Sequence, residues 1–396
     1  MRALNRGPFA SHSLLCFALA LANGATAAAT PPAPGCPELD EPPAAPPVGP
    51  WVTRVDASHV TLRWEEGSPG VPEVEVISPG AKPKVFRGPE ARRAKRVEGS
   101  KLPVPEGWLH QVTITGLRPS TRITYRIRCG HLAGRGGNVA TAPRAGEGFS
   151  FVALGDTRNG HDDHRLVALG AAKLAPDVLF HTGDMVPSGT PAEWRPFFDI
   201  EAALLSSALV VPALGNHEHI QGRDMFRHYF PCRERGPAGT ESCVRDYGDT
   251  RFIVLDTQGS LEQISWVRTM LQGWKDKLTV VIFHRPIHTM SHHPPLPTWQ
   301  MLLHPVLVER DVDLVLQGHN HVYERFEIDG VTYVTTGGGG APLYPVGSPG
   351  DEDDPRWRKA AAARHHYVVG RVAAGGADIE AIDARTGAVL DRFSIR

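Results

Sequence analysis

Five apolar segments of this chain each end in residues that can bind a metal ion, and this pattern constrains the fold more than any other feature of the sequence. Each segment has the length of a buried strand in a parallel sheet, and helix-length stretches separate the segments. Open α/β sheets bind their ligands just past the carboxyl ends of the strands. In chain order, the segments end in Gly155-Asp156, Gly183-Asp184, Gly215-Asn216-His217-Glu218, His284 and Gly318-His319-Asn320-His321.

Among these residues, two aspartates, one asparagine and three histidines are predicted donors at one edge of the fold: Asp156, Asp184, Asn216, His284, His319 and His321. This donor set is large enough for two metal ions that share one carboxylate. Asp184 is the predicted bridge, because a carboxylate can give one oxygen to each cation and offset their repulsion. A single Gly-Asp pair at a strand end is usually only a turn. Five such ends in series predict a dinuclear metal site.

Taken together, these motifs resemble the signature of the calcineurin-like metallophosphoesterase superfamily. The region upstream makes the chain similar to purple acid phosphatases in particular. The resemblance implies that residues 147–396 form a four-layer α/β/β/α sandwich. Within it, helical patterns are expected over 164–174, with its leucine and valine side inward, over 261–274 and over 304–310.

The resemblance also assigns the metal ligands. It implies that Asp156 and His321 bind the first metal ion and that Asn216, His284 and His319 bind the second. Imidazole and oxygen donors of this kind suit Fe, Zn or Mn.

His217 follows Asn216 directly and has a different role in the family pattern. The resemblance implies that it contacts the substrate phosphate and protonates the leaving oxygen, which suits a side chain whose ordinary pKa lies near neutrality. The alternative is that His217 only supports a neighbouring ligand.

Two positions depart from the family pattern. Purple acid phosphatases carry a tyrosine three residues after the bridging aspartate, where this chain has Pro187, so no coloured tyrosinate–iron centre is expected. Many other members have Asp-x-His at the first motif, where this chain has Arg158. The first metal ion is therefore one protein ligand short.

Nearby side chains can fill this gap or bind phosphate. We expect His164 to complete the first metal shell, with His161 or a water as alternatives and an exposed helix cap as the competing interpretation. Arg158 cannot bind a cation, but its fork can hold a phosphate oxygen. Similar enzymes use a histidine after the fourth motif for phosphate, which makes His293 or His292 a candidate, unless both are surface histidines without a role.

The N-terminus has the pattern of a secretory signal peptide over residues 1–27. Its apolar run, 13–22, follows two arginines, is too short to span a bilayer and ends before a small-x-small cleavage site. The alternative is an uncleaved apolar tail. Residues 28–50 are rich in proline and alanine and are expected to form a linker. We expect no transmembrane segment elsewhere, and a secreted or periplasmic protein.

Four cysteines remain after removal of the signal peptide, which permits two disulfides in an exported protein. We expect Cys232 to pair with Cys243 and Cys36 with Cys129. A lipid anchor at Cys36 is disfavoured, because an aliphatic residue is missing before it and the apolar run lies far away.

Residues 51–143 alternate between apolar and polar side chains in short segments broken by glycine and proline, which predicts an all-β sandwich. The Leu117-Arg118-Pro119 turn before a strand that contains Tyr125 resembles a fibronectin type III domain, in which the tyrosine lies at a sheet corner. Trp64 is the predicted core aromatic. We expect this domain to serve packing rather than chemistry.

The net charge of −1 gives no indication of a nucleic-acid partner. The main hypothesis is a metal-dependent hydrolase of small phosphate esters, with monoesters favoured. A phosphodiesterase of the same fold is the first alternative. A cell-surface adhesion protein with an inert metallophosphoesterase fold is the second.

Overall fold

The computed structural model describes residues 47–93, 107–220, 223–232, 234–274, 277–347 and 357–395. The predicted signal peptide, most of the linker and Cys36 lie outside these residues. Among the helices that are described, we find none with the length and hydropathy needed to cross a bilayer.

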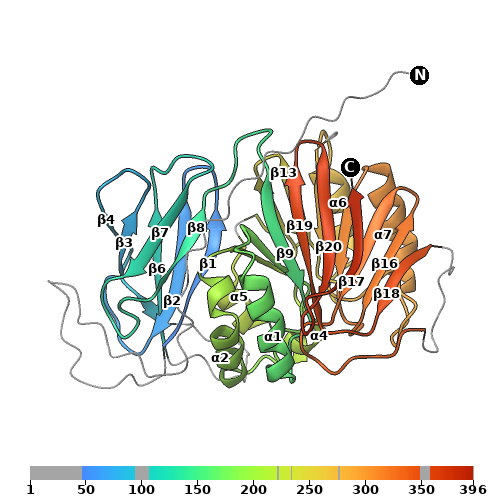
Figure 1. The fold of residues 1–396 in the computed structure, drawn as a ribbon, viewed down its shortest axis with the longest axis horizontal. Coiled ribbons are helices and arrows are strands. Elements are labelled where there is room, and N and C mark those ends of the chain that lie inside the picture. Colours follow the sequence, from blue (N-terminus) through green and yellow to red (C-terminus); the bar gives the residue numbers. More distant parts are fainter. Residues whose placement is uncertain are drawn as a thin grey trace. The chain divides into compact units, whose positions relative to one another are not determined.

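Two antiparallel groups of strands form the described N-terminal region (Figure 1). The first comprises β1 (Val48–Val55), β2 (Val60–Glu66), β6 (Trp108–Ile114) and β5 (Arg92–Arg93), and the second β4 (Lys84–Arg87), β3 (Glu73–Ile77), β7 (Arg122–Ile127) and β8 (Gly136–Ala140). Burial alternates along β7, as expected of a strand with one face on a core. The predicted core aromatic, Trp64, is 1% exposed and stacks on His110.

Strand β1 continues into the α/β region. It pairs in parallel with β11 (Leu209–Pro212), with Val52 opposite Leu209, so that one ten-stranded sheet runs through both regions. Trp51 of β1 is fully buried, and its indole N–H donates to the backbone oxygen of Tyr229 at 3.0 Å. The pairing was not expected from the sequence, because a parallel partner 150 residues away leaves no local pattern.

Tyr125 also bonds across this junction. Its buried hydroxyl donates to the backbone oxygen of Ser206 at 2.8 Å. The fibronectin III resemblance had instead predicted that this tyrosine lies at a corner of its own sheet. The tyrosine therefore links the N-terminal strands to the α/β region.

The α/β region consists of two sheets packed face to face. The first sheet continues from β11 through β10 (Val178–His181), β9 (Phe149–Leu154), β19 (His366–Ala373), β20 (Gly376–Asp383) and β21 (Val389–Ile395). The second has the order β12 (Cys243–Tyr247), β13 (Thr250–Val254), β14 (Thr279–Ile282), β15 (Leu314–Gln317), β17 (Val331–Thr336), β16 (Tyr323–Ile328) and β18 (Arg358–Ala362).

Alternation along the central strands separates two cores. Phe252 of β13 faces the first sheet, where its ring lies 4.9 Å from that of Phe180, whereas Ile253 packs with the helices on the other face. The first sheet carries α1 (His161–Ala172), α2 (Pro191–Ile200) and α3 (Ala202–Leu205), and the second carries α6 (Glu262–Met270) and α7 (Pro297–Glu309). Two short helices, α4 (Asn216–Ile220) and α5 (Asp224–Tyr229), follow β11. The predicted order of helix, sheet, sheet and helix layers is present.

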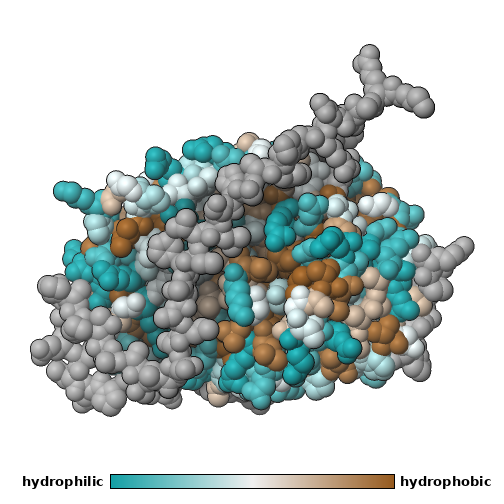
Figure 2. Space-filling view, viewed as in Figure 1, coloured by the Kyte–Doolittle hydropathy of each residue, from teal (hydrophilic) through white to brown (hydrophobic). Residues whose placement is uncertain are grey.

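Helix α1 corrects the expected orientation of its leucines. Val167 is buried, but Leu166 is 38% and Leu169 55% exposed. The inner face instead carries His164 and small residues such as Ala168. Figure 2 is drawn from the same side as Figure 1, in which α1 is visible, and it shows hydrophobic residues exposed among hydrophilic ones on this face of the molecule.

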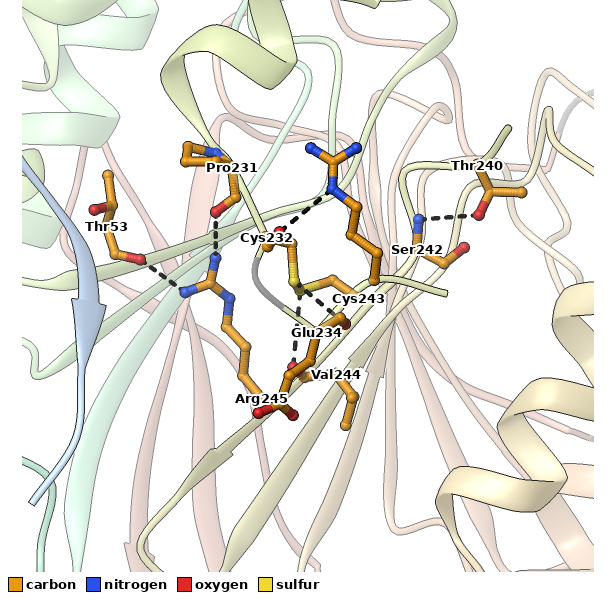
Figure 3. The surroundings of a disulfide bond; sticks show 10 residues. Thr53, Pro231, Cys232, Glu234, Thr240, Ser242, Cys243, Val244 and Arg245 are labelled. Atoms are coloured by element: carbon orange, nitrogen blue, oxygen red, sulfur yellow. Dashed lines mark hydrogen bonds between the residues drawn. A yellow bond between two sulfur atoms is a disulfide. The ribbon is translucent and has the colours of Figure 1, made fainter. Parts of the chain in front are cut away.

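The Cys232–Cys243 disulfide predicted from the sequence is present and closes a loop with a sequence separation of 11. Figure 3 shows Arg245 beside it, donating to the backbone oxygens of Thr53 and Pro231. Cys129 is also disulfide-bonded.

Candidate metal centre

The predicted metal donors meet where two facing sheets present the carboxyl ends of their parallel strands. Asp156 and Asp184 follow β9 and β10, and Asn216 begins α4 just after β11. The second sheet contributes His284 after β14, and His319 and His321 after β15. The strand pairings align these ends, so residues spread over about 170 positions reach one region.

Left-handed backbone conformations aim several donors. Asp156, Asp184 and His319 have φ values of 57°, 55° and 69°. Non-glycine residues adopt this region at a cost, and such residues cluster at functional sites. Gly183 has a φ of 97°, and a Cβ there would lie 2.9 Å from His284 Nδ1, so only glycine fits beside the donors.

The atoms assigned to the second metal ion point at one another. His284 Nε2 lies 3.0 Å from Asn216 Oδ1 and 3.3 Å from Asp184 Oδ1. One donor atom each of Asp184, His284 and His319 lie within 4.8 Å of one another. His284 Nδ1–H donates to the backbone oxygen of Thr182 at 2.9 Å, which directs the lone pair of a neutral ring at Nε2 into the group. Lone pairs that face each other in this way fit a cation between them.

The charges in this group depend on each other. Burial alone would lower the pKa of His284, but the adjacent Asp184 carboxylate raises it to about 9. Burial would raise the pKa of Asp184, but His284 and His217 hold it below its ordinary value. Burial lowers the pKa of His319 to about 2, so this ring stays neutral and can bind a metal ion.

The atoms assigned to the first metal ion are Asp156 Oδ1, Asp184 Oδ2 and His321 Nε2. Asp156 Oδ1 lies 3.6 Å from His321 Nε2, and it is buried without a hydrogen-bond partner among the described residues. His321 Nδ1–H donates to the backbone oxygen of Pro342 at 2.6 Å. Arg158 shares this position, because its Nε lies 3.2 Å from Asp184 Oδ2. The donor set fits a cation here too, but a guanidinium already contacts part of it.

His217 lies next to the bridging carboxylate of Asp184. Its backbone N–H donates to Asp184 Oδ1 at 3.0 Å, and its Nδ1–H donates to the backbone oxygen of Pro187 at 2.5 Å. Its Nε2 lies 3.7 Å from Asp184 Oδ2, and the side chain is 22% exposed. Pro187, which cannot act as the missing tyrosine, thus orients the histidine predicted to act as the acid.

His164 is a correction to the sequence analysis, because the structure directs it away from the metal donors. Its Nε2 lies 3.0 Å from Glu201 Oε1, both side chains are buried, and its ring packs on Phe197. His181 also approaches Glu201, at 3.9 Å. The sequence could not reveal that the buried carboxylate of Glu201, at the junction of α2 and α3, binds this imidazole. The alternative ligand, His161, is exposed at the start of α1.

His293 lies beside the second position, with its ring stacked on that of His319 at 4.3 Å. Its backbone N–H donates to Asn320 Oδ1 at 2.8 Å, which fixes the loop that carries it. His292 lies farther out and packs on Tyr344. This placement is compatible with the expected phosphate contact of His293.

Tyr344 lies at the site although no sequence motif assigned it a role. Its ring stacks on His321 with centroids 4.2 Å apart and 9° between the planes. Burial raises the pKa of its hydroxyl, and the nearby charge of Arg158 opposes this rise. The only local signal is an aromatic residue four positions after the Gly337–Gly340 run.

Glu218 was also given no role from the sequence. This fully buried carboxylate accepts hydrogen bonds from the backbone N–H groups of Asp184, Val186 and Gly215 at 2.8–3.1 Å. It therefore supports the turns that carry the bridging aspartate and the motif after β11.

Comparisons with known proteins identify phosphoesterases that are similar to this chain. A family model described as calcineurin-like phosphoesterase matches residues 149–323. The chain is 26% identical to purple acid phosphatase 15 of Arabidopsis thaliana over 59% of this chain and 54% of that protein. It is 27% identical to the glycerophosphodiester phosphodiesterase GpdQ of Enterobacter lignolyticus (strain SCF1) over 39% of this chain and 59% of that protein. The matches thus span little more than half the length of these curated relatives.

Two solved structures show the same fold. The purple acid phosphatase PPD1 from yellow lupin (Lupinus luteus) seeds matches with a TM-score of 0.70 at 18% identity. This match covers 88% of this chain and 74% of the PPD1 chain. A structure of PhoD matches with a TM-score of 0.64 at 12% identity, and the match covers 87% of this chain and 89% of the PhoD chain. Both similarities include the β-rich N-terminal region, because the α/β region alone is shorter than the part covered.

Proposed function

We propose that the calcineurin-like metallophosphoesterase domain that this chain contains hydrolyses phosphate esters, with small monoesters as the favoured substrates. The observation that carries this proposal is the group of lone-pair donors that converge on Asp184 from two sheets. Calcineurin-like enzymes and purple acid phosphatases use dinuclear centres of Fe, Zn or Mn. Similarity to purple acid phosphatases over more than half the chain supports the monoester preference.

Different residues of the chain would bind the metal ion, donate a proton and bind the phosphate. Asp184, Asn216, His284 and His319 would hold a metal ion at the second position. A bound ion lowers the pKa of water and offsets charge that develops on the phosphoryl oxygens. His217, oriented through its Nδ1–H, would donate a proton from Nε2 to the leaving oxygen. The guanidinium of Arg158 and the imidazole of His293 would donate to phosphate oxygens.

A phosphodiesterase is the second candidate function. The similarity to GpdQ, whose name describes a diesterase, favours it. An inert adhesion protein of the same fold is the candidate from a different class, and it requires a site without metal.

We further propose that the protein is exported to the periplasm or the medium. The Cys232–Cys243 disulfide and the disulfide-bonded Cys129 support this, since disulfides persist in oxidising compartments. The signal-peptide pattern over 1–27 supports it independently. The two antiparallel groups of strands in the N-terminal region support our assignment of a fibronectin III-like packing domain.

The test compares p-nitrophenyl phosphate with bis(p-nitrophenyl) phosphate, using purified protein supplied with Mn²⁺, Zn²⁺ or Fe²⁺. We expect a higher kcat/KM for the monoester and loss of both activities in Asp184→Asn. Asp162→Asn, at a fully exposed carboxylate on α1, is the matched control and should retain activity. A higher kcat/KM for the diester would favour the second candidate. A folded protein that retains no metal and cleaves neither ester would refute the hydrolase proposal.

A further inference from the structure

The contacts of Arg158 distinguish the two metal positions. Its Nε donates to Asp184 Oδ2 at 3.2 Å, and its Nη2 lies 3.5 Å from His321 Nε2. Its side chain is only 14% exposed. Its positive charge is near enough to the Tyr344 hydroxyl to oppose the rise that burial causes in the pKa of that tyrosine. The guanidinium therefore contacts two of the three atoms that the family pattern assigns to the first metal ion.

The proton positions strengthen this contrast. Because His321 Nδ1–H donates to the backbone oxygen of Pro342, the lone pair that would bind a metal ion is on Nε2, where Arg158 can donate to it. At the second position, His284 Nε2 instead faces two oxygens, Asn216 Oδ1 and Asp184 Oδ1. A neutral His284 therefore needs a cation beside it, whereas His321 already faces one.

The chain holds Arg158 in this place from several sides. Its backbone N–H donates to the backbone oxygen of Asp184 at 3.2 Å, which fixes the loop after β9 against the loop after β10. The ring of Tyr344 lies flat on His321, the histidine that the guanidinium contacts. A metal ion that entered here would have to lose its hydration water and also break the buried ion pair between Arg158 and Asp184.

We propose that the guanidinium of Arg158 occupies the first metal position, so that the centre binds one metal ion tightly and uses the protein's own cation in place of the other. This inference rests on the proposed function and narrows its metal requirement. Arg158 has no lone pair for a metal ion, but its charge offsets the Asp184 carboxylate and its fork matches a phosphate oxygen pair. Asp156 Oδ1 is left as a donor without a hydrogen-bond partner among the described residues, so removing Arg158 exposes three donors to a cation.

The test measures metal stoichiometry rather than activity. Metal-free wild type, Arg158→Ala and Arg158→His are saturated with Mn²⁺ and passed through a desalting column before elemental analysis. We expect one ion per chain in wild type and two in both variants, with the electron paramagnetic resonance signal changing from an isolated ion to a coupled pair. Arg165→Ala, which removes an exposed arginine of α1, should keep one ion.

A second pair of variants tests the inference without changing Arg158. His321→Ala should leave the single ion of wild type in place, whereas His284→Ala should remove it. Two ions in wild type, or loss of the single ion in His321→Ala, would overturn the inference while leaving the hydrolase proposal intact. No ion in wild type, together with no hydrolysis of either ester, would overturn both.

Discussion

Glu218 accepts a hydrogen bond from the backbone N–H of Asp184 at 3.1 Å, so a buried carboxylate supports the turn that presents the bridging donor. The other oxygen of Glu218 accepts from Val186 N–H at 3.0 Å, so both oxygens act as acceptors. These two hydrogen bonds hold the backbone turn that carries the bridging carboxylate of Asp184.

Replacing Glu218 by glutamine should weaken metal binding and destabilise the fold by about 1–3 kcal/mol, because one oxygen becomes an N–H₂ group that faces backbone donors. Metal titration and urea unfolding of the variant measure the two effects. Glu193→Gln, at a part-buried capping carboxylate on α2, provides the control for a backbone-bonded glutamate away from the site. Unchanged metal affinity in Glu218→Gln would show that this carboxylate does not position Asp184.

His217→Gln should lower kcat by roughly 10²–10⁴ while the metal content stays unchanged, because the residue donates a proton but holds no ion. The loss should be smaller for an ester whose leaving group needs no proton, such as p-nitrophenyl phosphate, than for an alkyl phosphate. Steady-state kinetics on both substrates measure this difference. An equal loss on both would contradict the role as acid.

The metal-free protein should lose stability as the pH rises from about 6.5 to about 9. His284 has a pKa of about 9 in the folded chain because Asp184 faces it, against about 6.5 when unfolded, so its ion pair stabilises the fold fully below 6.5 and is lost as the pH passes 9. The shift corresponds to roughly 3 kcal/mol. Thermal unfolding of chelator-treated protein across this range measures it.

Metal binding should show the complementary dependence on pH. The ion requires a neutral His284, so the gain in Tm on adding metal should increase over the same interval. His284→Asn should remove this part of the pH dependence in the metal-free protein. A wild-type Tm that does not fall between pH 6.5 and 9 would contradict the assignment.

His164→Ala should destabilise the protein by roughly 3 kcal/mol, because it opens a cavity and leaves the buried Glu201 carboxylate without its 3.0 Å partner. His161→Ala, at the exposed start of the same helix, should change stability by less than about 0.5 kcal/mol. Both variants should retain the wild-type metal stoichiometry. Loss of an ion from His164→Ala would restore the ligand role that the structure does not support.

Replacing Cys232 and Cys243 together by serine should lower the free energy of unfolding by about 2–3 kcal/mol, since the bridge closes a short loop. Urea unfolding of the double variant measures the loss. The nearby Arg245, which bonds to Thr53 and Pro231, holds the same region independently, so the fold should survive. A stability equal to that of wild type would mean that these contacts already constrain the loop.

The sequence by itself determined which donors meet. Apolar runs that end in Gly-Asp, Gly-Asn-His or Gly-His-x-His report strand ends, and parallel strands align such ends at one edge of a sheet. The placement of Asp184 near His284 and His319 therefore followed from local pattern. The Cys232–Cys243 bridge followed in the same way, from short spacing.

Only the tertiary structure decided how the remaining side chains are used. His164 faces Glu201, Arg158 lies between Asp184 and His321, and Tyr344 covers His321. Each of these contacts joins residues far apart in the chain, and burial and hydrogen bonding select the partner once the sheets have packed. Periodicity predicts which side of an element turns inward, and for α1 that prediction was wrong for the leucines, since Leu169 is exposed. The charge or ring that an inward side chain meets depends on another element of the fold.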